Sequence, residues 1–211
     1  MRTFMQRLMA MLSLSLGLCI GATAQTGPQA AQVVVAAAAT ATPATRPALV
    51  DHNTVSAAHT GWMMTSTALV LLMTLPGIAL FYAGMVRRKN VLNTMASVVA
   101  IAALVSLLWF ASGYSLAFTP GSAWLGGFDR MGFTGLDFQL AQGRLALSHV
   151  APHIPESVYA MFQLTFAIIT AALLVGALVE RMRFSAMLIF VGLWSLLVYA
   201  PVAHWGLEPG G

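Results

Sequence analysis

The chain has 211 residues, of which 59% are hydrophobic and 8% are charged, and its formal net charge is +4. Soluble domains carry about 25% charged residues, so this composition excludes an ordinary soluble domain and indicates a protein of the lipid bilayer. Five of the ten basic residues lie at Arg87–Lys89 and Arg181–Arg183, which is typical of membrane topology and differs from the extended basic face of a nucleic-acid-binding protein.

Residues 1–24 have the pattern of a signal peptide. Two arginines precede the apolar stretch 8–20, and the small residues ATA at 22–24 favour cleavage after Ala24. An uncleaved first transmembrane helix is the alternative interpretation. Export by such a signal implies a bacterial-type inner (plasma) membrane with the mature amino terminus outside. Cleavage would also remove Cys19, the single cysteine, so no disulfide or thiolate chemistry is expected.

Residues 25–60 are rich in alanine, threonine and proline and almost free of charge. Such a composition predicts a flexible extracytoplasmic segment. Its two histidines, His52 and His59, are expected to be solvated.

Four apolar stretches follow within residues 61–211, and each is long enough to cross a bilayer as a helix. The predicted spans are about 62–86, 91–118, 157–179 and 184–203. The first contains Pro76-Gly77, a helix-breaking pair that a membrane helix tolerates where neighbouring groups satisfy the freed backbone. The fold class is therefore an all-α membrane protein, a multi-span helical bundle.

The connections between the spans predict the topology. The links 87–90 and 180–183 are short, which makes the helices they join antiparallel neighbours, and both carry arginine, which favours the cytoplasmic side. The glycine-rich segment 119–156 and both ends of the mature chain are then outside. An aromatic belt at the outer interface is expected from five residues: Trp62, Tyr114, Tyr159, Tyr199 and Trp205.

Two long blocks of the sequence resemble the ammonium transporter (Amt/Mep/Rh) family. ALVLLMTLPGIALFYAGMVRRKNVLN (68–93) is similar to the family's first-helix signature, and FQLTFAIITAALLVGALVERMRFSAMLIF (162–190) to its third helix and the start of its fourth. GYSLAF (113–118) and YAPVAHW (199–205) resemble the ends of the second and fourth helices. On these blocks the chain is identified as the amino-terminal portion of a member of this family.

The resemblance implies a homotrimer of eleven-helix subunits, each with a narrow hydrophobic pore between two inverted halves. Aromatic faces would attract ammonium at the outer entrance, and a dry pore would exclude bare ions. The implied partners are ammonium or ammonia, with methylammonium as an analogue, the lipid bilayer, and a PII-type signalling protein at the inner links. The implied role is nitrogen uptake.

Site residues follow from the same resemblance. Phe166 takes the position of the family's outer gate phenylalanine, and Phe162, one turn earlier, takes a vestibule position. Leu207 stands where the family has its vestibule tryptophan, and the neighbouring Trp205 is the candidate substitute. His204 is not one of the family's pore histidines, and a structural role at the outer interface is expected for it.

The family's two pore histidines and its second gate phenylalanine have no counterpart in this sequence, which contains only four of eleven expected helices. The chain therefore looks truncated, and alone it is not expected to conduct. An ammonium sensor and a non-conducting membrane remnant are the alternatives, and the DNA downstream of residue 211 would discriminate among them. The spans contain no carboxylate pair, nucleophile–base set or cofactor loop, so no enzyme, catalytic residue, metal or cofactor is expected.

Overall fold

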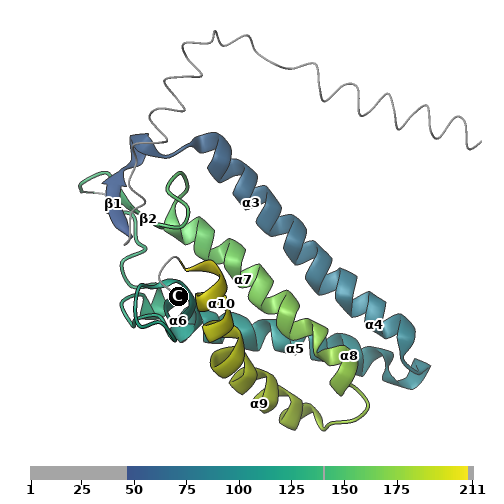
Figure 1. Ribbon diagram of the computed structural model, residues 1–211. Helices are drawn as coiled ribbons and strands as arrows, with labels where there is room; N and C mark the ends of the chain where they lie inside the picture. The colour runs from purple at the N-terminus through teal and green to yellow at the C-terminus, as the bar shows by residue number, and fades with distance from the viewer. Residues whose placement is uncertain (1–46, 140, 209–211) are drawn as a thin grey trace, which may run out of the picture. The chain divides into compact units, whose positions relative to one another are not determined.

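The computed structural model of the chain describes residues 47–139 and 141–208 (Figure 1). The predicted signal peptide at 1–24, with Cys19, and the first part of the predicted flexible segment lie outside the described residues. Within the described part, four helical spans are long and apolar enough to cross a membrane: Ala57–Met85, Arg88–Phe118, Glu156–Leu178 and Phe184–Leu207. The predicted helical bundle is confirmed. The first span begins about five residues earlier than expected, and the fourth ends about four residues later.

In the first span the hydrogen-bonding pattern changes from α-helical to π-helical around the proline noted in the sequence. It consists of α3 (Ala57–Leu72), a π-helical turn (Met73–Ile78) and α4 (Ala79–Met85). Pro76 lies inside the π turn. A proline has no N–H and its ring crowds the carbonyl one turn before it, and the wider π turn absorbs both effects without ending the helix.

The other spans are built from the following elements. The second span contains α5 (Val91–Leu108), a π turn (Trp109–Gly113) and α6 (Tyr114–Phe118). The third contains α7 (Glu156–Leu173) and the short α8 (Val175–Leu178), and the fourth contains α9 (Phe184–Trp194), a π turn (Ser195–Tyr199) and α10 (Ala200–Leu207).

Helix α7 is the centre of the bundle, because α3 packs on one of its sides and α5 on another (Figure 1). Helix α5 also contacts α4 and α9, and α6 contacts α10. Small residues permit this packing: Ala171 and Ala172 of α7 are fully buried. At Gly176 a Cβ atom would come within 2.5 Å of the Tyr82 ring, and the Tyr82 hydroxyl donates to the carbonyl of Leu173 at 3.1 Å.

Part of the predicted flexible segment 25–60 is ordered, which corrects that prediction for residues 48–60. Strand β1 (Ala48–Asp51) pairs in antiparallel register with β2 (Arg144–Leu147), and a 3-10 turn follows at His52–Thr54. The pairing partner lies almost a hundred residues further along the chain, so the local composition of β1 carries no sign of it. Ser56 then caps α3, because its side chain accepts a hydrogen bond from the His59 amide.

The predicted aromatic belt is wrong for two of its members. Trp62 and Trp205 are exposed, but Tyr114 and Tyr159 are buried. The hydroxyl of Tyr114 is satisfied inside the protein by the carboxylate of Glu156, 3.1 Å away. Both tyrosine rings belong to an aromatic cluster with Trp109 of the π turn and Phe118 of α6. A tyrosine with an internal partner has no need of the membrane surface.

Candidate functional site

Phe162 and Phe166 lie one turn apart on α7 and contact each other. Their ring centroids are 5.0 Å apart and the rings meet edge to face at 73°, as expected for positions i and i+4 of one helix. The ring of Phe162 is half-buried, whereas Phe166 keeps 39% of its surface exposed. The structure thus brings the two predicted phenylalanines together, with one ring facing outward from the described bundle.

The helix that carries these rings is fixed by its own polar residues. The hydroxyl of Thr165 donates to the carbonyl of Phe162 at 2.6 Å, and that of Thr170 donates to the carbonyl of Phe166 at 2.7 Å. Both hydroxyls are therefore satisfied within α7. A membrane helix can hold threonine in this way without a wet path beside it.

Trp205, the candidate substitute for the vestibule tryptophan, pairs with Trp124 from the glycine-rich segment 119–156. The two indole rings meet edge to face with centroids 5.6 Å apart, and Nε1 of Trp205 donates to the carbonyl of Trp124 at 3.2 Å. Both rings are exposed, and so is Leu207. Trp124 was not among the predicted site residues, although an aromatic residue in a glycine-rich segment is a visible signal.

His204 has the structural role that its position predicts. It is fully buried on α10, with Nδ1 3.2 Å from the carbonyl of Ala117 and Nε2 3.0 Å from that of Ser122. The imidazole therefore joins α10 to the end of α6 and to the segment that follows α6.

A buried ionic network that no sequence pattern predicted lies at the amino-terminal end of α7. Glu156 begins this helix and its side chain is 0% exposed. The Arg130 guanidinium lies 3.0 Å from its Oε2, and the Tyr114 hydroxyl donates to its Oε1. A carboxylate in the first turn also suits the positive end of the helix dipole. The available signal was one acidic residue at the start of an apolar span.

A second buried pair ties the end of the fourth span to the segment before α7. His149 Nε2 and Glu208 Oε1 are 2.5 Å apart, and the two side chains are 1% and 2% exposed. This contact and the Arg130–Glu156 ion pair tie segment 119–156 to the bundle, in addition to its chain connections.

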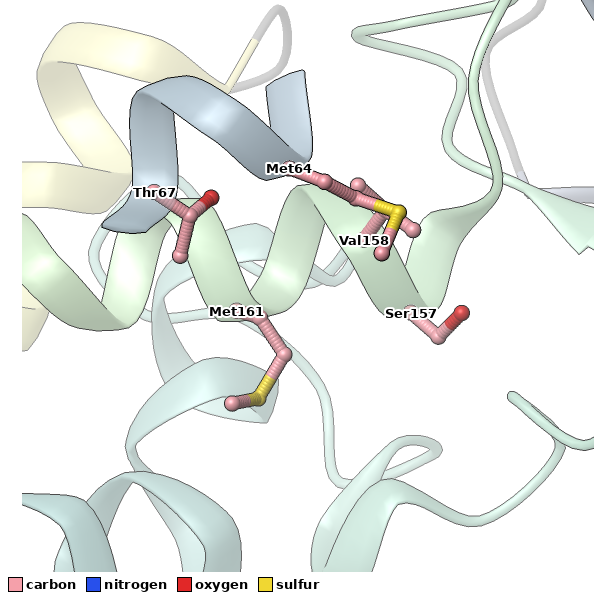
Figure 2. Close-up of a pocket in the computed structure, with 5 residues that line it drawn as sticks. All are labelled: Met64, Thr67, Ser157, Val158 and Met161. Carbon is pink, nitrogen blue, oxygen red and sulfur yellow. The ribbon is translucent and has the colours of Figure 1, made fainter. Parts of the chain in front are cut away.

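A shallow apolar groove of about 280 Å³ lies between α3 and α7 (Figure 2). Met64 and Thr67 of α3 and Ser157, Val158 and Met161 of α7 line it. None of these side chains titrates near neutral pH, and none is a predicted site residue. Among the described residues there is also no group of three or more histidine, cysteine or acidic side chains that could hold a metal.

A sequence model of the Ammonium Transporter Family matches residues 61–211. The chain belongs to this family. It is 47% identical over 146 residues to an ammonium transporter of Bacillus subtilis, a match that covers 69% of this chain and 34% of the relative. It is 45% identical over 148 residues to an ammonium transporter of Aquifex aeolicus, which covers 70% and 33% of the two chains.

The fold leads to the same family. The crystal structure of Candida albicans Mep2 matches with a TM-score of 0.66 and 31% sequence identity, over 77% of this chain and 34% of that one. The family assignment and the multi-pass membrane fold predicted from the sequence are thus confirmed. The chain spans about a third of the length of the curated relatives it matches.

Proposed function

We propose that this family member serves the passage of ammonium or ammonia across the membrane, with methylammonium as an accepted analogue. The observation that carries the proposal is the match of the whole helical region, residues 61–211, to the ammonium transporter family. The relatives from Bacillus subtilis and Aquifex aeolicus are named ammonium transporters.

Phe162 and Phe166 are the proposed aromatic entrance and outer gate. The two rings meet edge to face on α7, and the Phe166 ring is exposed at the surface of the described bundle. An aromatic face attracts a small cation by about 0.5–2 kcal/mol. The rings offer no hydrogen-bond acceptor to replace lost water, so an ion that passes them bare is strongly disfavoured. Ammonium differs from sodium or potassium in that it can release a proton and pass as a neutral molecule.

Trp205 and Trp124 are proposed to supply the outer aromatic surface where Leu207 offers none. Both indoles are exposed, and the hydrogen bond from Trp205 to the Trp124 carbonyl fixes one against the other. Indole is the aromatic side chain with the strongest attraction for cations.

The proposed membrane is a bacterial-type inner membrane, with the mature amino terminus outside and a homotrimer as the assembly. At the opposite end of the bundle from the outer segment, Asn90 Nδ2 donates to Glu180 Oε1 at 2.6 Å, so the two short links lie together. The basic residues Arg87–Lys89 and Arg181 and Arg183 beside them are exposed. This surface is where a PII-type signalling protein is proposed to bind.

Uptake of radiolabelled methylammonium in a host without ammonium transporters tests the proposal. The chain by itself spans about a third of its relatives' length, so we expect it to give no saturable uptake. A chimera that joins it to the remaining helices of the Bacillus subtilis relative is expected to restore uptake. A correctly inserted chimera without any uptake would contradict the transport function, and wild-type uptake by the chain alone would contradict the need for further helices.

Substitution at the entrance tests the assigned residues in the same chimera. Phe162→Ala removes one cation-attracting ring, so the KM for methylammonium should rise about two- to thirtyfold, the equivalent of 0.5–2 kcal/mol. Phe81→Ala is the matched control, because Phe81 is an exposed phenylalanine on α4. Equal effects of the two substitutions would contradict a specific role for the Phe162 ring.

A further inference from the structure

Two histidines lie beside each other at the amino-terminal end of α3. His59 belongs to the first turn of α3 and His153 to the segment before α7. Their ring centroids are 6.0 Å apart and their planes differ by 29°. Both side chains are exposed, and within residues 47–139 and 141–208 neither ring forms a hydrogen bond. Their nitrogens are thus available to a ligand.

One residue holds both histidine backbones in place. The amide of Ser56 donates to the carbonyl of His153 at 3.2 Å, and the Ser56 hydroxyl accepts from the amide of His59 at 3.3 Å. The start of α3 is therefore fastened to the segment before α7 at the point where the rings meet. A ligand that binds both rings finds their backbones already positioned and has only the side-chain torsions to order.

The separation of the rings suits one shared metal ion. A metal–nitrogen bond of about 2.0–2.1 Å plus the ring radius places two imidazoles on one ion with centroids at most about 6.4 Å apart. The observed 6.0 Å lies within that limit. The ring planes lie only 29° apart in a stacked arrangement, so both exposed side chains must rotate to turn a nitrogen of each toward a shared ion.

The surroundings decide which class of ion fits. The pair lines a pocket of about 310 Å³ with Trp62, Val150 and Pro152 among its walls, and no carboxylate lines it. The side-chain donors in its lining are therefore the two imidazoles and the thioether of Met63, a soft ligand that binds hard cations poorly. Calcium and magnesium need several oxygen ligands, whereas copper, nickel and zinc bind imidazole well.

We propose that His59 and His153 form a two-histidine binding site for a divalent transition-metal ion on the outer face of the protein. Water completes the coordination of the ion, and the order of affinity follows copper above nickel and zinc. The bound ion joins α3 to the segment before α7 through their side chains, in addition to the Ser56 contacts.

Copper titration of the full chain in detergent, purified without a histidine tag, tests the site. All variants carry Cys19→Ser, which removes the single thiol. We expect one Cu²⁺ ion per chain, with nitrogen hyperfine structure in its electron paramagnetic resonance spectrum. His59→Ala and His153→Ala should each weaken binding at least tenfold. His52→Ala is the matched control, because His52 is an exposed histidine whose ring already contacts the Gly143 carbonyl.

Equal copper affinity in the wild type and in the His59→Ala/His153→Ala double variant would overturn the proposal, and so would an equal loss in His52→Ala. A second readout does not depend on copper. Zn²⁺ should slow hydrogen exchange of the Ser56 amide in the wild type and leave it unchanged in the double variant. Identical exchange with and without Zn²⁺ in both proteins would also overturn it.

Discussion

Removal of Arg130 should destabilise the outer end of the bundle strongly. Arg130→Ala leaves the Glu156 carboxylate, which is 0% exposed, with the Tyr114 hydroxyl as its remaining partner among the described residues. Breaking a buried pair from one side costs about 3–5 kcal/mol. Because the Arg130 side chain keeps 17% of its surface exposed, some solvent already reaches the pair. We therefore expect the lower end of this range, about 3 kcal/mol.

Thermal unfolding of the full chain in detergent measures this effect. For a protein of this size, about 1 kcal/mol corresponds to a shift in Tm of roughly 2–4 °C, so Arg130→Ala should lower the Tm by roughly 6–12 °C. Glu156→Gln in the same chain removes the unpaired charge and should recover most of the loss. Arg144→Ala is the matched control, because Arg144 is an exposed arginine of β2 and its replacement should change stability by less than about 0.5 kcal/mol.

An Arg130→Ala variant whose Tm falls no further than that of Arg144→Ala would refute a stabilising ion pair between Arg130 and Glu156. A double variant, Arg130→Ala with Glu156→Gln, that is less stable than Arg130→Ala alone would also contradict it. In that case the charge on Glu156 would not be the source of the cost.

Two further predictions concern the inner half of the bundle. Gly176→Ala should destabilise the chain by about 1–3 kcal/mol in the same unfolding assay, because the new Cβ would lie 2.5 Å from the Tyr82 ring. Gly84→Ala is the control: nothing lies within 4 Å of a Cβ at that position, so this change should be neutral or slightly stabilising. The hydrogen bond from Asn90 lowers the pKa of Glu180 below its ordinary value, so this contact is present above that value and is lost as the pH falls through the lowered pKa. Asn90→Ala should move the pKa of Glu180 back up in a carboxyl carbon NMR titration, and an unchanged pKa would contradict the assignment.

The spans could be predicted because each depends on a local property of the chain. An apolar stretch in lipid must form all its backbone hydrogen bonds internally, and a helix does so. The short links 87–90 and 180–183 make the helices that they join antiparallel. The positions of Phe162 and Phe166 on one face follow from their spacing alone. Even the tolerance of Pro76 was foreseeable, although the π turn that accommodates it was not.

The missed features all join residues that are distant in the sequence. Strand β1 depends on β2, Glu156 depends on Arg130 from another segment, and Trp124 reaches Trp205 across about eighty residues. No local pattern marks such contacts, because each residue by itself resembles an ordinary loop or interface residue. The burial of Tyr114 was mispredicted for the same reason, since its internal partner Glu156 was unknown.

The sequence by itself determined the membrane class, the four helices and the family, because these depend on hydrophobicity, length and contiguous blocks of residues. The tertiary structure alone decided which polar residues of the outer segment are buried and paired, and that His59 and His153 lie together. The physical reason is that helices form through backbone hydrogen bonds between residues close in the sequence. Ion pairs and shared ligand sites instead need side chains that folding brings together from distant parts of the chain.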